Sequence, residues 1–318
     1  MTGESFYLHQ KFRDFDEFCE NALNWDLDYR QLEAGNFSSE LLMFGNESTL
    51  FTHAKIERRL LQKGTAPQDL ITFGVLADPG INIHWRNIDI SGNKLFIFPP
   101  GGELFGITQA DFDVFVISLP EPKLDQVCAS FELPELRKLV AGHEVFACEP
   151  RLLDSFRSRL RQREREITGH SVAINQQLLL QQLESELADY LIRLLAGCNQ
   201  SVGRGLLRKR DLALKSAEDY IHESANEVVT IPELCNASNA SQRTLEYAFR
   251  ERYGLTPKEY TLIYRLNNVR KQLRQALPVK DQVSRIAQQH GFWHMGQFSA
   301  SYRKLFAELP SETLKQIR

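Results

Sequence analysis

With 318 residues the chain is long enough for two domains, and 42% hydrophobic with 25% charged residues is typical of a globular protein. No run of about 18 apolar residues occurs and the N-terminus resembles no export signal, so we expect a cytoplasmic protein that does not cross a membrane. The five cysteines are scattered and form no C-x-x-C pair. This favours reduced, mostly buried thiols over a disulfide framework.

The net charge of −3 conceals a difference between the two halves of the chain. Residues 1–203 hold 19 Lys and Arg against 29 Asp and Glu, a charge of −10, whereas residues 204–318 hold 19 against 12, a charge of +7. A cationic part joined to an anionic part is typical of a polyanion-binding module attached to a domain that does not bind nucleic acid.

Short apolar stretches separated by turn residues fill residues 27–118, and this spacing predicts an antiparallel β-sandwich or β-barrel. From about Pro134 to residue 197 the pattern is helical. We therefore expect an α+β chain of two domains. The N-terminal domain is 1–197, the linker is 198–212, and an all-α domain covers 213–318.

One predicted helix, residues 174–195, carries a narrow apolar stripe at helical spacing. Its members are Leu180, Leu183, Leu187, Tyr190 and Leu194. Two interpretations stay open, a seam between two copies of the chain and a helix packed on its own β-domain.

The most informative feature is a repeat in the C-terminal part. Four framework residues recur 53 positions later: Leu245 as Phe298, Phe249 as Tyr302, Gly254 as Ala307 and Pro257 as Pro310. Each copy has the pattern of a short helix, a tight turn and a second helix, which is the DNA-binding helix-turn-helix. The sequence therefore predicts a protein that reads two adjacent stretches of DNA.

The second helix of the first copy, residues 241–252, presents polar side chains opposite its apolar face. Arginine can bond guanine, glutamate can accept from cytosine and glutamine can pair with adenine. We predict base contacts from Gln242, Arg243, Glu246 and Tyr247, and DNA backbone contacts from Ser241 and Arg250. The alternative is a merely solvated face.

The corresponding helix of the second copy is residues 294–306, whose outward surface has few groups that read bases. We predict base contacts from His294, Met295 and Gln297 and a backbone contact from Arg303. A histidine that caps its own helix is an equal alternative for His294. The first copy should therefore discriminate sequence more strongly than the second.

A helix over residues 257–275 should join the two copies, with Thr256 as its cap. Its length of roughly 30 Å approaches the roughly 34 Å of one DNA turn, so helices at its two ends could enter successive major grooves. Arg265 and Arg270 on this helix are predicted phosphate contacts, and a merely solvated face is the alternative.

A series of short motifs runs from Ser241-Gln-Arg-Thr-Leu245, through Gly254-Leu-Thr-Pro257 and Gly291-Phe292, to Gln297-Phe298 and Leu309-Pro310. This series resembles the AraC/XylS family of bacterial transcription regulators. Within it, residues 291–298 are most similar to the subgroup of the ethanolamine-utilisation operon regulator, whose ligands are ethanolamine and adenosylcobalamin.

The resemblance implies a cupin-like β-barrel that binds an effector or dimerises, followed by a DNA-binding domain of seven helices. The implied base readers are Arg243, Glu246, Tyr247, Met295, Gly296 and Ala300. The implied partners are double-stranded DNA, RNA polymerase, a small-molecule effector and a second copy of the chain. Ala307 stands where the family has glycine, so we expect that turn to differ.

A barrel could also be a cupin-type metal enzyme fused to a DNA-binding domain. The barrel region has His53 and His84 without closely paired histidines, and we find no nucleophile elbow, P-loop or H-E-x-x-H motif. We therefore expect no enzyme activity, no metal and no cofactor. A barrel that responds only to a protein partner is a third possibility. The prediction is a sequence-specific transcription regulator, an activator, tuned at its N-terminal domain.

Overall fold

The computed structural model describes residues 4–85, 88–169, 176–198, 200–201, 209–224, 227–277 and 282–315. Contacts divide the chain into two compact units. The first consists of Met1–Tyr29 and Phe37–Arg204, and the second of Arg30–Asn36 and Gly205–Arg318.

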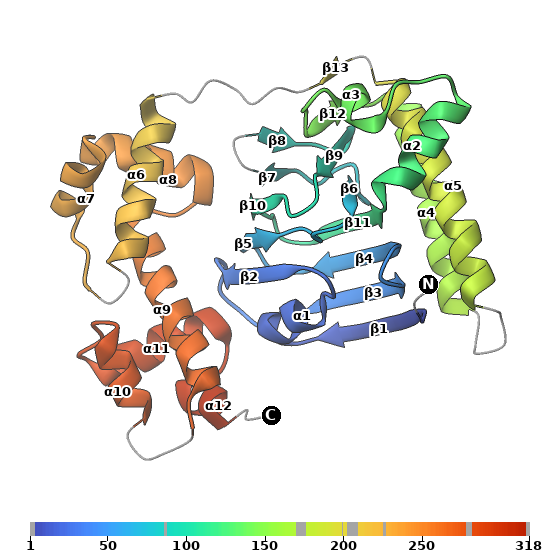
Figure 1. Cartoon of the computed structure of the whole chain (residues 1–318). Helices are drawn as coiled ribbons and strands as arrows, with labels where there is room; N and C mark the ends of the chain where they lie inside the picture. Colours follow the sequence, from blue (N-terminus) through green and yellow to red (C-terminus); the bar gives the residue numbers. More distant parts are fainter. Residues whose placement is uncertain are drawn as a thin grey trace. The chain divides into compact units, whose positions relative to one another are not determined.

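Two antiparallel sheets form the first unit, as predicted (Figure 1). In the described part of the chain the larger sheet has eight strands, in the order β1 (Phe6–Phe12), β3 (Ser39–Gly45), β4 (Leu50–Ile56), β11 (Phe112–Leu119), β6 (Ile71–Leu76), β9 (Lys94–Phe98), β12 (Val145–Ala147) and β13 (Gln200–Ser201). The smaller has five, in the order β2 (Asp26–Gln31), β5 (Leu60–Thr65), β10 (Glu103–Ile107), β7 (Ile83–Trp85) and β8 (Ile88–Ile90).

Strand β11 lies inside the larger sheet and pairs with both β4 and β6, so that Phe115 is opposite His53 on one side and Val75 on the other. Its alternate residues serve two apolar regions. Phe112, Val114 and Val116 line a cavity to which both sheets contribute. Phe115, Ile117 and Leu119 belong to the core shared with the helices. Both faces of the strand are thus largely buried, which explains its nearly continuous apolar sequence.

The helices of the first unit are α1 (Phe15–Asn21), α2 (Glu121–Ser130), α3 (Leu136–Val140), α4 (Pro150–Gly169) and α5 (Gln176–Ala196). Helices α4 and α5 lie side by side, and α5 contacts α2 and β11 (Figure 1). The leucines of the α5 stripe are at most 4% exposed within the single chain. Of the two interpretations of this stripe, the structure therefore supports packing on the chain's own β-domain.

Some short elements differ from the prediction. Strand β1 and helix α1 precede the predicted β-region, and α2 begins before Pro134. Strand β12 interrupts the predicted helical stretch, and β13 lies in the predicted linker. Strands of three and two residues carry too little periodicity to be recognised in a sequence. Helix α6 begins at Lys209, inside the predicted linker. Ile174 and linker residues 199 and 202–208 lie outside the described residues.

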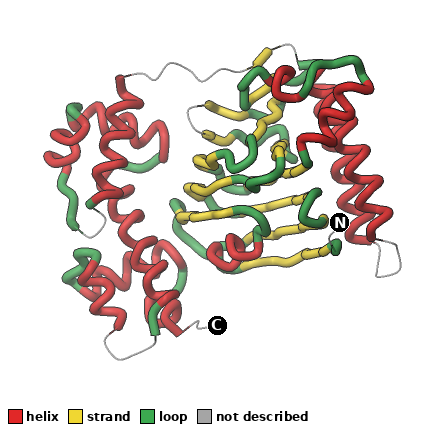
Figure 2. The backbone as a smooth tube through the Cα atoms, viewed as in Figure 1, coloured by secondary structure: helices red, strands yellow, loops and turns green. Residues whose placement is uncertain are grey.

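In its described residues the second unit has seven helices, the number that the family resemblance implies. They are α6 (Lys209–Glu223), α7 (Ile231–Ser238), α8 (Gln242–Tyr253), α9 (Pro257–Gln275), α10 (Gln282–Gln289), α11 (Met295–Phe306) and α12 (Pro310–Lys315). Figure 2 shows that its described residues from Lys209 onward form helices joined by loops. One helix-turn-helix, α7 and α8, and the other, α10 and α11, lie near opposite ends of α9 (Figure 1).

Local sequence explains where these helices begin. Thr230 and Thr256 each form a capping box with the glutamate three residues later, Glu233 and Glu259, and a proline occupies the first turn in both cases. The Ser241 side chain accepts a hydrogen bond from the Thr244 backbone N–H at 3.2 Å and so caps α8.

The helix ends repeat as well, and one expectation about them is wrong. Gly254 follows α8 with φ 65° and ψ 14°, and Ala307 follows α11 with φ 58° and ψ 17°. Ala307 therefore adopts the left-handed conformation usual for glycine, and the turn does not differ. Gly291 also has a positive φ, 72°, and a Cβ there would lie 2.9 Å from an Arg265 guanidinium nitrogen.

Candidate nucleic-acid interface

Helix α8 presents a polar face opposite a buried one. Leu245, Ala248 and Phe249 are at most 3% exposed and pack into the core of the second unit. On the other side Gln242, Arg243, Tyr247 and Arg250 are exposed, together with the cap residue Ser241, and Glu246 is half-buried. The buried positions agree with the prediction, and the predicted reading residues of this helix reach the surface together.

Several of these side chains are held by neighbours. Gln242 Nε2 donates to Glu246 Oε1 at 2.8 Å, one helical turn away. The guanidinium of Arg210, on α6, stacks on the Tyr247 ring with its carbon 4.8 Å from the ring centre, and it also pairs with Glu251. Within the described residues, Arg243 and Arg250 make no side-chain hydrogen bond, ion pair or ring contact, although the charge of Arg250 acts on Glu259. The face therefore combines two ordered side-chain pairs with two guanidinium groups open to a ligand.

The corresponding face of α11 has fewer polar side chains that could contact bases. His294, Gln297 and Arg303 are exposed and Met295 is half-buried, while Phe298 and Tyr302 are at most 2% exposed. His294 occupies the cap position of α11, but its side chain makes no capping hydrogen bond. The structure therefore does not support the capping alternative, and the imidazole is open to a partner.

One exposed residue near this face was not singled out from the sequence. Trp293 directly precedes His294 and is 69% exposed, although tryptophan is usually well buried. No sequence signal separates it from Phe292, which is 9% exposed. Only the packing of the turn between α10 and α11 decides which of the two aromatic rings faces outward.

The predicted phosphate contacts on α9 are not at the surface. Arg265 is 8% exposed, stacks on Phe292, and its Nε donates to the His290 carbonyl oxygen at 2.8 Å. Arg270 is 4% exposed and pairs with Glu308. Both arginines connect α9 to the second helix-turn-helix, so the prediction that they reach phosphates is corrected.

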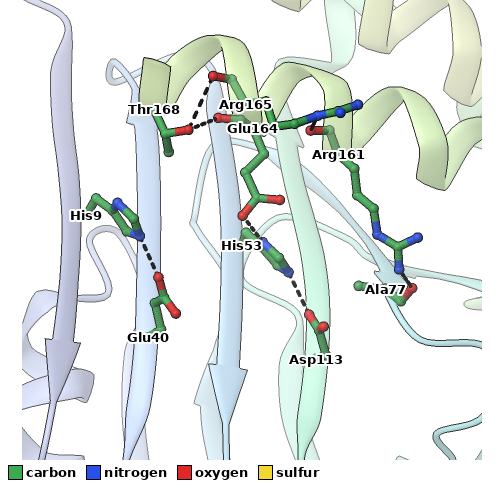
Figure 3. A network of polar contacts seen from close by, with 9 residues as sticks. All are labelled: His9, Glu40, His53, Ala77, Asp113, Arg161, Glu164, Arg165 and Thr168. Carbon is green, nitrogen blue, oxygen red and sulfur yellow. Dashed lines mark hydrogen bonds and ion pairs between the residues drawn. The ribbon is translucent and has the colours of Figure 1, made fainter. Parts of the chain in front are cut away.

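The histidines of the first unit are engaged with carboxylates. His53, on β4, is 5% exposed, with Nδ1 2.7 Å from Glu164 on α4 and Nε2 2.6 Å from Asp113 on β11 (Figure 3). Burial lowers the pKa of His53, but hydrogen bonds and charges from Asp113 and Glu164 outweigh it, and the pKa is raised. Asp113 is therefore part of a contact between α4 and the sheet.

His84 lies elsewhere in the first unit, with Nδ1 2.7 Å from Asp89. Across the described residues, no group of three or more histidine, cysteine or acidic side chains is arranged to hold a metal ion. Nor does any helix among them have the length and apolar character needed to cross a membrane.

The family described as "Helix-turn-helix domain" matches residues 234–316, from α7 to the end of α12. Residues 234–316 form an AraC-type helix-turn-helix domain. The match covers both copies of the repeat and the helix α9 between them.

Two regulators are similar to this AraC-type part. The probable thc operon regulatory protein of Rhodococcus erythropolis is 33% identical over 104 residues, which are 33% of this chain and 31% of its own length. The XylDLEGF operon transcriptional activator of Pseudomonas putida is 29% identical over 126 residues, covering 40% of this chain and 39% of its own. The chain thus spans well under half the length of these relatives.

Among solved structures, the AraC-like transcriptional activator CuxR aligns with 81% of this chain and 94% of its own. The sequence identity is 15% and the TM-score is 0.42.

Proposed function

We propose that this chain is a sequence-specific transcription activator that binds double-stranded DNA through the exposed faces of α8 and α11. The observation that carries the proposal is the duplicated helix-turn-helix, in which one buried framework supports two outward polar faces. The positive charge of residues 204–318 favours the same partner, because phosphate contacts supply much of the affinity for DNA.

The roles of the α8 residues follow from their chemistry. Arg243 suits bidentate bonding to guanine, whereas the Gln242–Glu246 pair suits an adenine or a cytosine amino group. Tyr247, held by Arg210, can contact a base or its sugar. Arg250 and Ser241 flank these groups and suit phosphates.

The second helix-turn-helix, α10 and α11, makes fewer direct base contacts in this proposal. His294, Met295 and Gln297 are the base-contacting candidates of α11, and Arg303 suits a phosphate. Trp293 adds a large apolar surface that can contact a thymine methyl group or a sugar. We expect α8 to impose the stronger sequence preference.

Selection of bound duplexes from a random library by the purified full chain tests the proposal. We expect a motif in two parts about one DNA turn apart. Arg243→Ala should relax the preference at one base of one part and weaken binding by about 1–3 kcal/mol. Lys215→Ala, an exposed charge on α6 outside both helix-turn-helix units, is the matched control. An equal loss of affinity on all sequences would instead mark Arg243 as a phosphate contact.

Activation requires more than DNA. We infer that the DNA-bound chain acts on RNA polymerase in the cytoplasm, as expected of a bacterial activator. Transcription from a selected site by purified polymerase, with and without the chain, tests this, and unchanged or reduced transcript would contradict the activator role. We propose no catalytic role. Stoichiometric iron or zinc in the purified chain would support the alternative, a cupin-type metal enzyme.

We further propose that the first unit binds a small molecule in the cavity between its sheets, which has a volume of about 80 Å³. Its wall is mainly apolar and includes the aromatic rings of Trp25, Trp85, Phe96 and Phe98. Gln62 also lines it, is 6% exposed, and has no hydrogen-bond partner for Nε2. An unpaired buried donor costs free energy, so an acceptor on a ligand would be favoured there.

These features point to a ligand class. Among the described residues that line the cavity none is charged, so the ammonium group of ethanolamine would find no carboxylate. Adenosylcobalamin far exceeds the volume. For comparison, a cavity of about 150 Å³ accepts benzene. We therefore propose a small neutral compound with a carbonyl or ether oxygen that accepts from Gln62 Nε2.

The melting temperature of the full chain tests this assignment with acetone and 2-butanone as probes and ethanolamine as the charged comparison. We expect the ketones to raise it and ethanolamine to leave it unchanged. Gln62→Leu should remove the advantage of a ketone over a hydrocarbon of equal size. A response to ethanolamine alone would contradict the assignment, and the absence of any response would favour a regulator that answers to a protein partner.

A further inference from the structure

Two cysteines far apart in sequence meet at one end of a short ladder in the first unit. Cys148 directly follows β12, and Cys198 comes two residues before β13. These strands pair through Phe146 with Ser201 and Ala147 with Gln200. The two sulfur atoms are 3.0 Å apart, within about 1 Å of the roughly 2.05 Å of a disulfide bond.

Both cysteines are held in place by backbone hydrogen bonds. The Cys148 N–H donates to the Asn93 carbonyl oxygen at 3.0 Å, and the Cys198 N–H donates to the Leu195 carbonyl oxygen at 3.1 Å. Cys148 is 8% exposed and belongs to the core beneath α4 and α5, whereas Cys198 is only half-buried. A small oxidant therefore reaches the pair from the Cys198 side, and little movement is needed to join the sulfurs.

The surroundings favour a thiolate on Cys148. A hydrogen bond from the Cys198 thiol lowers the pKa of Cys148, and burial opposes this. The Leu95 backbone N–H and the positive charge of Arg157 lower the pKa further, so the net shift is downward. Arg157 is 2% exposed and one of its terminal nitrogens, Nη2, has no hydrogen-bond partner. The pKa of Cys198 is raised, first because its thiol is hydrogen-bonded to Cys148 and then because of burial.

We propose that peroxide oxidises Cys148 and Cys198 to a reversible disulfide, which joins the end of β12 to the chain leaving α5. Cys148 is the nucleophile and Cys198 the resolving cysteine. The site takes hydrogen peroxide or a small organic hydroperoxide as its oxidant.

The chemistry balances in two steps. The Cys148 thiol first releases its proton, and the thiolate attacks a peroxide oxygen. The O–O bond breaks and the leaving hydroxide takes up that proton as water, which leaves a sulfenic acid on Cys148. The Cys198 sulfur then attacks the Cys148 sulfur, the S–O bond breaks, and a second water leaves. Overall two thiols lose two electrons and two protons, and one hydrogen peroxide becomes two waters.

The position of the bond gives it a structural consequence. It closes a loop of 50 residues that contains α4 and α5, and it fastens the two-residue strand β13 to the edge of the larger sheet. The oxidised chain should therefore be more stable than the reduced chain, because the cross-link restricts the unfolded state. We expect the melting temperature of the first unit to rise by roughly 5 °C or more.

Mass spectrometry of the full chain treated with hydrogen peroxide tests the proposal. We expect the intact mass to fall by about 2 Da, the free thiols to fall from five to three, and a peptide linking Cys148 to Cys198, all reversed by dithiothreitol. Five remaining thiols, or a bond that involves another cysteine, would overturn the proposal without affecting the proposed DNA binding.

Three variants separate the roles. Cys198→Ser should stop at a sulfenic acid on Cys148, a gain of about 16 Da that a dimedone probe captures, and Cys148→Ser should show no change. Cys128→Ser is the matched control, because Cys128 is 1% exposed in the same core and burial raises its pKa. This variant should still form the bond. Even if a variant folds poorly, the peptide map of the unaltered chain shows whether Cys148 and Cys198 are linked. A cross-link that survives in Cys148→Ser would contradict the role of Cys148 as nucleophile.

Discussion

Gly254 and Ala307 end α8 and α11 with the same left-handed backbone, although only one of them is glycine. In both turns the backbone N–H of this residue donates to the carbonyl oxygen four residues earlier, Arg250 or Arg303. The second copy thus keeps the geometry of the first at a cost, because an L-residue with a side chain is strained in this conformation.

Replacing Ala307 by glycine should relieve that strain. We expect Ala307→Gly to raise the free energy of unfolding of the second unit by about 1 kcal/mol, and Gly254→Ala to lower it by a similar amount. Urea titration of the full chain measures both. The control is Ala300→Gly in the interior of α11, where glycine should destabilise by about 1 kcal/mol. If Ala300→Gly and Ala307→Gly changed the free energy of unfolding in the same direction, the explanation would be contradicted.

Arg270 should matter for stability and not directly for DNA. Arg270→Ala removes its ion pair with Glu308 and its contact with the Phe306 ring, and we expect a loss of about 2 kcal/mol in the free energy of unfolding. The salt dependence of DNA binding should stay unchanged, because no phosphate contact is lost. Both quantities are measured on the same preparation.

Arg250→Ala is the opposite case. Arg250 is exposed on α8, so its loss should change stability by no more than about 0.5 kcal/mol. The slope of log affinity against log salt should become shallower by about 1. If Arg270→Ala changed the slope and Arg250→Ala did not, the assignment of these two arginines would be reversed.

The contact of His53 with Asp113 and Glu164 predicts a pH dependence of the first unit. The pKa of His53 is raised in the folded chain, so its contribution to stability is complete below about pH 6.5 and is lost as the pH rises through the raised value. Unfolding in urea at a series of pH values should show this decline, and His53→Gln should flatten it. Parallel pH profiles for the two proteins would refute the prediction.

The contribution of Glu164 to stability has the opposite dependence on pH. Burial raises its pKa, but the hydrogen bond and charge of His53 outweigh this and the pKa is lowered. Its contribution to stability is therefore present above about pH 4.3 and is lost as the pH falls through the lowered value. Glu164→Gln should therefore reduce the loss of stability that the first unit shows at acidic pH. His9→Gln is the control, because the His9–Glu40 pair is about one-third exposed and should contribute little (Figure 3).

Trp293 should contribute to DNA affinity. Because it is 69% exposed, Trp293→Ala should leave the free energy of unfolding nearly unchanged while it weakens DNA binding by roughly tenfold, about 1.4 kcal/mol. Fluorescence titration with a labelled duplex measures the affinity. An unchanged affinity would remove Trp293 from the proposed interface.

The sequence by itself determined the features that depend on near neighbours. The 53-residue repeat, the caps at Thr230 and Thr256, and the buried face of α8 follow from helical periodicity and from hydrogen bonds that span three or four residues. The strand-rich front half is visible for the same reason, because side chains alternate along a strand.

Only the tertiary structure decided which polar groups meet. An exposed arginine on α8 and a buried arginine on α9 look alike in a sequence, and what separates Arg250 from Arg270 is the position of Glu308. His53 and Glu164 are 111 residues apart, and Cys148 and Cys198 are 50 apart. No local pattern encodes such pairs, since they arise when whole elements pack together and bring distant side chains within a few ångströms of each other.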